Sequence, residues 1–129
     1  MKKILIIEDN HDIRENISEL LELSGYETLQ AHNGLKGIES AHKNNPDLII
    51  CDIMMPEMDG YGVLNTLNKN ITTVGIPFIF LTAKAEKSDF RKGLSMGADD
   101  YITKPFTDDE LLHAVKMKQK KIETFKSIL

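Results

Sequence analysis

A short apolar run followed directly by an acidic residue constrains the fold of the whole chain more than any other feature of the sequence. Residues 48–51 are consecutive apolar residues, which is typical of a central strand of a parallel sheet, buried on both faces. Asp52 comes next, and Pro56 and the turn-forming pair Asp59 and Gly60 follow soon after. We therefore expect the chain to leave the sheet just after Asp52 and to present its carboxylate at the carboxyl end of the strand. Open α/β sheets bind ligands at that edge.

Strand-like and helix-like segments alternate along the chain. The strands are short apolar runs, and the helices have apolar residues at helical spacing with stop signals such as Gly25 and Gly97. The expected strands are residues 3–7, 26–31, 48–51, 78–81 and 101–103. Asn10 or Asp12 is expected to cap the first helix. The next three helices are expected at residues 33–42, 60–68 and 88–96, and the last is expected to start near Thr107. In the second helix, Leu35, Ile38 and Ala41 are expected to face the core.

This alternation predicts the α/β class, specifically a flavodoxin-like, doubly wound five-stranded parallel sheet with helices on both faces. The expected strand order is 2-1-3-4-5, with the less apolar second strand nearer an edge. In that order the first and third strands are neighbours, so Glu8 and Asp9 would meet Asp52 at one edge of the sheet. We expect the domain to cover residues 1–120 and residues 121–129 to form a helical extension or the start of a linker.

Composition limits the classes of function. The chain has 129 residues, of which 41% are apolar, and this suits one globular domain with a single core. A net charge of −4 argues against direct nucleic-acid binding by this domain. Cys51 is the one cysteine and lies in the expected buried strand, which fits a reducing compartment. The first apolar run is too short for a signal peptide or a membrane span, so we expect a cytoplasmic protein without membrane contact.

Carboxylates gathered at one edge need a partner of opposite charge. Two carboxylates about 4 Å apart repel by roughly 4 kcal/mol at an effective dielectric near 20. The candidate ligands Glu8, Asp9 and Asp52 offer only oxygens, which favours a hard divalent cation, with Mg²⁺ as the best candidate and Mn²⁺ as a substitute. A backbone carbonyl near Met54 is a further candidate ligand. The alternative is that Glu8 and Asp9 merely cap the first helix.

Two further strand ends carry reactive side chains. Thr82 follows the fourth strand and Lys104 closes the fifth, so a hydroxyl and an ammonium are expected at the same edge as Asp52. Taken singly, Thr82 is most often a helix cap and Lys104 a solvated charge. Together they fit attack of the Asp52 carboxylate on a phosphoryl group. The metal and Lys104 would neutralise the phosphoryl oxygens, and Thr82 would donate a hydrogen bond.

Four segments resemble the motifs of the receiver domains of bacterial two-component response regulators, in the same order and at similar intervals. They are residues 4–9, 47–60, 81–84 and 97–106, and the resemblance extends from residue 2 to about 118. It implies that Asp52 is the phosphoacceptor and that Glu8 and Asp9 hold the metal, although Glu-Asp replaces the commoner Asp-Asp pair. It also implies that Thr82 and Lys104 sense the phosphoryl group.

The same resemblance implies a two-state switch. Tyr101 matches the switch aromatic, which turns inward as Thr82 moves, and the Lys104-Pro105 peptide bond is expected to be cis. The readout face is expected on the fourth helix, fifth strand and fifth helix. Met54 and Lys84 match positions that tune how fast the phosphoryl group is lost.

The partners implied are a sensor histidine kinase or a histidine phosphotransfer protein. The chain is then no enzyme, although it assists its own phosphorylation and dephosphorylation. A homodimer through the readout face or the C-terminal helix is a further expectation. A receiver-like module that docks without phosphorylation stays open as the alternative. Two other classes are disfavoured: residues 8–12 would repel a flavin phosphate, and Met54 stands where a haloacid dehalogenase phosphatase needs a second Asp.

The C-terminal segment leaves two readings open. Its apolar residues fall on a four-three spacing, namely Leu111, Val115, Ile122, Phe125 and Leu129. This could begin a coiled coil between two protomers, or the helix could pack on the sheet through the first two residues and then fray. Residues 116–129 carry five lysines and one glutamate, which is usual for a solvated helix face.

Overall fold

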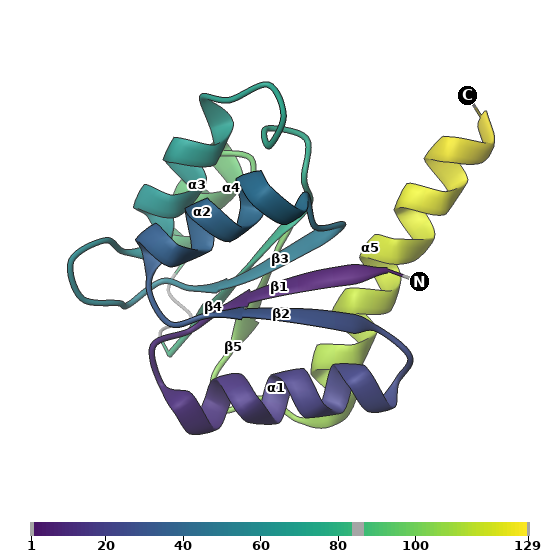
Figure 1. The fold of residues 1–129 in the computed structure, drawn as a ribbon, viewed down its shortest axis with the longest axis horizontal. Coiled ribbons are helices and arrows are strands. Elements are labelled where there is room, and N and C mark those ends of the chain that lie inside the picture. Colours follow the sequence, from purple (N-terminus) through teal and green to yellow (C-terminus); the bar gives the residue numbers. More distant parts are fainter. Residues whose placement is uncertain (1, 84–86, 129) are drawn as a thin grey trace.

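The computed structural model of this chain describes residues 2–83 and 87–128, and it has the predicted alternation of strands and helices (Figure 1). The elements are β1 (Lys3–Ile7), α1 (His11–Leu23), β2 (Glu27–Ala31), α2 (Gly34–Asn44), β3 (Leu48–Asp52), α3 (Gly60–Asn68), β4 (Phe78–Thr82), α4 (Lys87–Ser95), β5 (Asp100–Thr103) and α5 (Asp108–Ile128). The predicted fold class is therefore confirmed.

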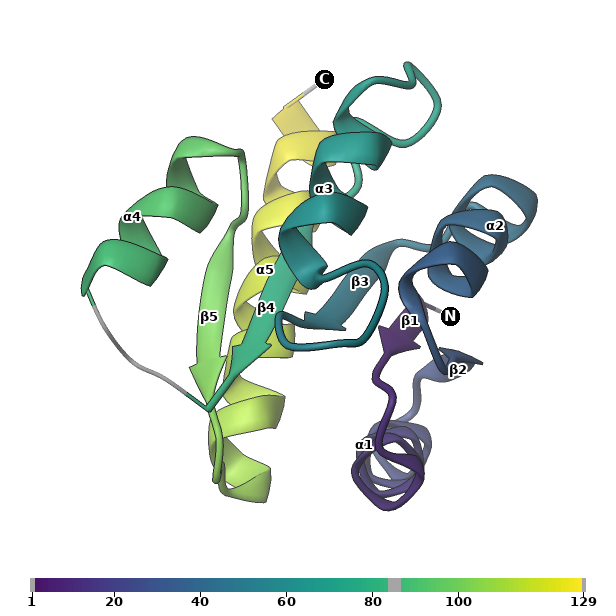
Figure 2. The same cartoon turned by 90° about the vertical axis from the view of Figure 1, so that its left-hand side faces the viewer.

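The five strands form one parallel sheet in the order β2-β1-β3-β4-β5, as predicted. The less apolar β2 is an edge strand, and Figure 2 shows β5 with α4 at the opposite edge. Ile7 of β1 pairs with Cys51 of β3, and Asp52 pairs with Leu81 of β4. This register brings the carboxyl ends of the strands to the same edge of the sheet. Asp52 and Thr82, which were expected just after their strands, are the last strand residues.

The core has two layers because neighbouring side chains along a strand point to opposite faces. Leu5 and Ile7 of β1 pack on the side of α2 and α3, whereas Ile4 and Ile6 pack on the side of α1 and α5. Figure 1 shows α2, α3 and α4 on one side of the sheet and α1 and α5 on the other. Both faces of β1, β3 and β4 are thus covered, which explains their continuous apolar runs.

The prediction of which α2 residues face the core is partly wrong. Ala41 is buried and Ile38 is half-buried, but Leu35 is 59% exposed. The face that packs inward begins with Gly34, where an added Cβ would lie 3.0 Å from Val63 of α3. One residue along an α-helix turns the side chain by about 100°, so Leu35 points away from that contact.

The last helix packs on the sheet as predicted for its first two apolar residues. Leu111 and Val115 are buried against the sheet, and α5 continues as one helix to Ile128 (Figure 1). The side chains of Ile122 and Phe125, and Leu129 altogether, lie outside what the structure describes, so the coiled-coil reading stays a prediction. The expected domain boundary at residue 120 falls within the continuous helix. In the described part of the chain, no helix combines the length and apolar character that a membrane span needs.

Candidate functional site

The predicted site residues come from the carboxyl ends of four neighbouring strands. Glu8 directly follows β1, Asp52 and Thr82 end β3 and β4, and Lys104 directly follows β5. Parallel pairing in the observed register places these positions at one edge of the sheet. Thr82 is buried there, and its backbone carbonyl accepts a hydrogen bond from the N–H of Lys104 at 2.7 Å.

Three carboxylates meet at this edge. Oxygens of Glu8, Asp9 and Asp52 all lie within 4.8 Å of one another. Glu8 is fully buried and Asp52 is only 5% exposed, whereas Asp9 is exposed, so the cluster opens to solvent on the side of Asp9. The geometry also decides against the helix-cap alternative. The side chain that caps α1 is that of Asn10, which accepts a hydrogen bond from the N–H of Ile13 at 3.0 Å.

Lys104 supplies the positive charge of the site. Its Nζ lies 2.5 Å from Oε1 of Glu8 and 3.3 Å from Oδ1 of Asp52, so one ammonium contacts two of the three carboxylates. The Lys104-Pro105 peptide bond is cis, as expected. With only 19% of the Lys104 side chain exposed, these contacts are largely shielded from water and are stronger than a surface ion pair.

The protonation of the site follows from this crowding. Burial, and then the neighbouring Asp52 carboxylate, raise the pKa of Glu8 from 4.5 to about 7, against the opposing effect of Lys104. Burial lowers the pKa of Lys104, but the hydrogen bond to Glu8 and the charge of Asp52 outweigh it and leave that pKa raised. Lys104 is therefore charged at neutral pH, while the carboxyl of Glu8 changes its protonation there.

The donor set fits a hard divalent cation. Oε1 of Glu8 is taken by Lys104, but Oε2 is buried and has no hydrogen-bond partner among the residues that the structure describes. A buried oxygen without a partner is costly, and a cation between the three carboxylates would satisfy it. All three side chains offer oxygens, which suits Mg²⁺ or Mn²⁺. Met54, whose carbonyl was a candidate ligand, follows β3 by two residues, and the residue is 67% exposed.

The loop after β3 is held against Asp52 by Gly60. A Cβ on Gly60 would come within 2.5 Å of the carbonyl oxygen of Asp52, and the N–H of Gly60 donates to the carbonyl of Ile53 at 2.9 Å. Asp59, expected as a turn residue, caps α3 by accepting a hydrogen bond from the N–H of Gly62. Only glycine allows this close return of the chain beside the acidic cluster.

Tyr101 contacts α4. Its hydroxyl accepts a hydrogen bond from the backbone N–H of Gly93 at 3.0 Å, and its ring packs on Phe80 with centroids 5.4 Å apart. The side chain is half-buried in this position. Lys84, the other residue expected to tune the site, lies outside the described residues.

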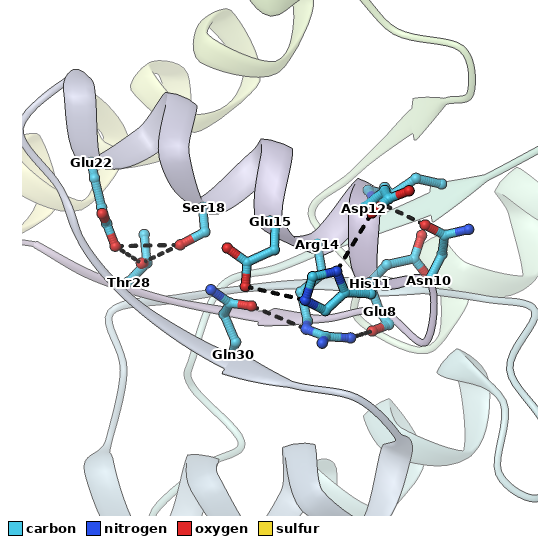
Figure 3. A network of polar contacts seen from close by, with 11 residues as sticks. Glu8, Asn10, His11, Asp12, Arg14, Glu15, Ser18, Glu22, Thr28 and Gln30 are labelled. Carbon is cyan, nitrogen blue, oxygen red and sulfur yellow. Dashed lines mark hydrogen bonds and ion pairs between the residues drawn. The ribbon is translucent and has the colours of Figure 1, made fainter.

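Sequence reasoning missed Arg14. Its Nη1 donates a hydrogen bond to the backbone carbonyl oxygen of Glu8 at 2.8 Å, and its Nε donates to Oε1 of Gln30 on β2 at 3.0 Å (Figure 3). The helical spacing of α1 marks Arg14 only as a polar position between Ile13 and Ile17. Its approach to the acidic cluster depends on how α1 folds back over β1 and β2.

Comparisons with known proteins agree with this geometry. The family model of the response regulator receiver domain matches residues 4–116. The chain is 42% identical over 116 residues to the DNA-binding dual master transcriptional regulator RpaA of Synechocystis sp., covering 90% of this chain and 48% of RpaA. It is 44% identical over 115 residues to the phosphate regulon transcriptional regulatory protein PhoB of Pseudomonas aeruginosa, covering 89% of this chain and 50% of PhoB.

The fold also matches solved structures. The receiver domain of the Francisella response regulator 1452 has a TM-score of 0.88 and 34% sequence identity, over 95% of this chain and 99% of that one. The chain spans about half the length of RpaA and PhoB. Because the family model covers most of the chain and the sheet has the strand order that the alternation of strands and helices predicted, this chain belongs to the response regulator receiver domains of two-component systems.

Proposed function

We propose that Asp52 accepts a phosphoryl group from a phosphorylated histidine, with a divalent cation, Mg²⁺ or in its place Mn²⁺, held by Glu8, Asp9 and Asp52. The observation that carries the proposal is the convergence of these carboxylates with the ammonium of Lys104 at one edge of the sheet. A site built only for structure has no need to bury two carboxylates beside each other and leave one oxygen without a hydrogen bond to any residue that the structure describes.

The residues present supply the groups that phosphoryl transfer requires. A carboxylate oxygen of Asp52 forms the new bond to phosphorus while the bond from phosphorus to the donor imidazole nitrogen breaks, and the electron pair leaves with that nitrogen. The bound cation, when present, neutralises negative charge on the phosphoryl oxygens. Lys104 stands beside Oδ1 of Asp52 and would pair with the same oxygens, and Thr82, buried at the end of β4, would donate a hydrogen bond.

We propose that the output of this chemistry is a change on the face formed by α4, β5 and α5. Thr82 ends β4 at the site edge, and Tyr101 on β5 is attached to α4 through Gly93. A phosphoryl group that draws Thr82 toward Asp52 would let Tyr101 turn inward and leave Gly93. Phosphorylation shifts this equilibrium only by its different contacts in the two states, and the contacts with Thr82 and Lys104 are that difference.

The partners proposed follow from the chemistry and the family. The phosphodonor is a sensor histidine kinase or a histidine phosphotransfer protein, and the domain is a phosphoacceptor that assists its own phosphorylation and dephosphorylation without acting on a separate substrate. RpaA and PhoB are by name transcriptional regulators. Since the net charge here is −4, we propose that any DNA contact in such a protein lies outside this domain. Dimerisation through the α4-β5-α5 face or α5, and a cytoplasmic location, remain predictions.

A mass measurement tests the phosphoacceptor directly. The chain is incubated with MgCl₂ and a small phosphodonor such as acetyl phosphate, and its intact mass is recorded. One added phosphoryl group raises the mass by roughly 80 Da. We expect this rise in the wild type and not in Asp52→Asn. Asp12→Asn is the matched control because Asp12 is a fully solvated acid on α1, and it should be modified like the wild type.

Two outcomes would contradict the proposal. Modification of Asp52→Asn to the same extent as the wild type would place the phosphoryl group on another residue. An unmodified wild type, at a phosphodonor concentration that labels a known receiver domain, would favour the docking module that works without phosphorylation.

A further inference from the structure

Arg14 joins three elements near the acidic cluster without contacting a carboxylate. It lies in the first turns of α1, donates from Nη1 to the backbone carbonyl oxygen of Glu8, and donates from Nε to the side-chain amide of Gln30 on β2 (Figure 3). Both acceptors are neutral oxygens. Among the described residues, no Asp or Glu oxygen lies within ion-pair distance of the Arg14 guanidinium. Arg14 therefore does not compete with a cation for the carboxylates of the cluster.

The contact with Glu8 fixes one particular peptide group. The carbonyl of Glu8 belongs to the planar peptide bond that joins Glu8 to Asp9, so its direction also sets the direction in which Asp9 leaves the strand. On the other side of Glu8, its N–H donates to the carbonyl of Ala31 on β2 at 3.1 Å. Glu8 is therefore held to β2 directly through its N–H and indirectly, by way of Arg14 and Gln30, through its carbonyl.

Asp9 needs this support more than the other two acids do. Glu8 and Asp52 are buried and are held by their packing and by Lys104, whereas Asp9 is exposed and lies in the turn between β1 and α1. Its oxygen still falls within 4.8 Å of the other two. A cation site requires its ligands to be held in place before the ion arrives, because otherwise ordering them lowers the affinity.

We propose that Arg14 is a positioning residue for the divalent cation, acting through the Glu8-Asp9 peptide group and anchored on β2 by Gln30. The inference rests on the proposed function only in taking Glu8, Asp9 and Asp52 as the cation ligands. The planar guanidinium donates to two acceptors in fixed directions, which the single ammonium of a lysine does not reproduce. The bridge, and not only the positive charge, is what holds the ligands.

The test is titration of the full chain with MgCl₂ alone, followed by calorimetry, with no phosphodonor present. Arg14→Lys keeps the charge and removes the bridge, and we expect its Kd for Mg²⁺ to rise by about tenfold, the effect typical of losing a partner that orients a metal ligand. Gln30→Leu removes only the anchor and should give a smaller rise. Arg91→Lys is the matched control, the same chemical change at an exposed position of α4, and should bind like the wild type.

The effects of Arg14→Lys and Gln30→Leu on the Kd for Mg²⁺ should not be additive. If the bridge acts as one unit, Gln30→Leu weakens Mg²⁺ binding in the wild type but adds nothing in the Arg14→Lys background. A charge effect alone would leave Arg14→Lys at the wild-type Kd, and that result would overturn the proposal. Should Arg14→Lys unfold, Gln30→Leu decides alone, because Gln30 is exposed and its replacement is less disruptive to folding. An unchanged Kd in Gln30→Leu would then overturn the bridge.

The outcome separates this inference from the proposed function. Asp9→Ala is titrated in parallel and is expected to lose Mg²⁺ binding. Failure of the wild type to bind Mg²⁺, or equal binding by Asp9→Ala, counts against the cation site itself. If Asp9→Ala loses Mg²⁺ binding as expected but Arg14→Lys binds Mg²⁺ with the wild-type Kd, only the proposed role of Arg14 is refuted.

Discussion

Replacing Glu8 by glutamine should remove a pH dependence of stability that the wild type shows in the absence of Mg²⁺. Glu8 is fully buried, and one of its oxygens lacks a hydrogen bond among the described residues. Burial and the Asp52 carboxylate raise its pKa to about 7 in the folded protein, against an ordinary value of 4.5. The folded state therefore holds this proton more tightly than the unfolded state does.

The sign and size of the pH dependence follow from the pKa of Glu8 in the unfolded and folded states. Below pH 4.5 the carboxyl is neutral in both states and the folded protein has its full stability. As the pH rises from 4.5 to about 7, the unfolded chain loses the proton first, so the free energy of unfolding falls, and the loss is complete above pH 7. At about 1.4 kcal/mol for each pH unit, the wild type loses about 3 kcal/mol across this window. Glutamine has no proton to lose, so Glu8→Gln should not show this decrease.

Urea unfolding followed by circular dichroism at pH 5, 6, 7 and 8, in buffer with a chelator, measures this difference. The free energy of unfolding of Glu8→Gln minus that of the wild type should rise by about 2–3 kcal/mol from pH 5 to pH 8. Glu19→Gln, the same change on the exposed surface of α1, is the control and should follow the wild type. Saturating MgCl₂ should abolish the dependence in the wild type, because the cation binds the ionised carboxylate.

Parallel curves for the wild type and Glu8→Gln would refute the reasoning. They would mean that the ammonium of Lys104, 2.5 Å from Oε1 of Glu8, fully compensates burial and keeps the carboxyl ionised throughout the range.

Three further predictions concern neighbouring positions. MgCl₂ at one hundred times its Kd should stabilise the wild type by about 2.7 kcal/mol and so raise its melting temperature, and Asp9→Ala should lose this rise. An equal rise in both proteins would exclude Asp9 as a ligand. Met54→Asn should shorten the lifetime of the phosphorylated form, measured by loss of the added mass, if the exposed Met54 shields the phosphoryl group from water; equal lifetimes reject this role. Gly93→Ala should cost about 1–3 kcal/mol in urea unfolding, since its Cβ would clash with the hydroxyl of Tyr101 and lie 2.9 Å from the ring of Phe80, and an unchanged stability would show that Tyr101 moves away freely.

Much of this architecture follows from local patterns in the sequence. The apolar runs of β1, β3 and β4 are buried on both faces, and parallel pairing then brings the residues at their carboxyl ends together. For this reason the sequence alone predicts that Asp52, Glu8 and Lys104 lie at one edge of the sheet. Leu35 was misplaced because spacing alone does not say which stripe of a short helix packs, and the small residue Gly34 sets the close approach of α2 to α3.

Contacts that depend on how elements fold over one another could not be predicted. The bridge from Arg14 to Glu8 and Gln30 links α1 to β2 and to the residue that follows β1, and no spacing along the chain encodes it. The contact of Tyr101 with Gly93 likewise requires α4 to lie against β5 at the one residue without a side chain. The sequence therefore identifies the acidic residues of the site, whereas the contacts that hold them in place can be recognised only from the packing of the elements.

The pairing of Lys104 links the cation site to the proposed switch. In this structure its ammonium contacts both Glu8 and Asp52, and it is the one positive group within ion-pair distance of the cluster among the described residues. A phosphoryl group on Asp52 would carry about two negative charges and compete for that ammonium. Lys104 would then move away from Glu8, whose pKa is already raised and whose second oxygen has no partner among the described residues. Glu8 would be left without a compensating positive charge if no cation replaced the ammonium. Cation and phosphoryl group should therefore bind cooperatively, each strengthening the other by the same factor, because the cation takes over the charge that Lys104 gives up.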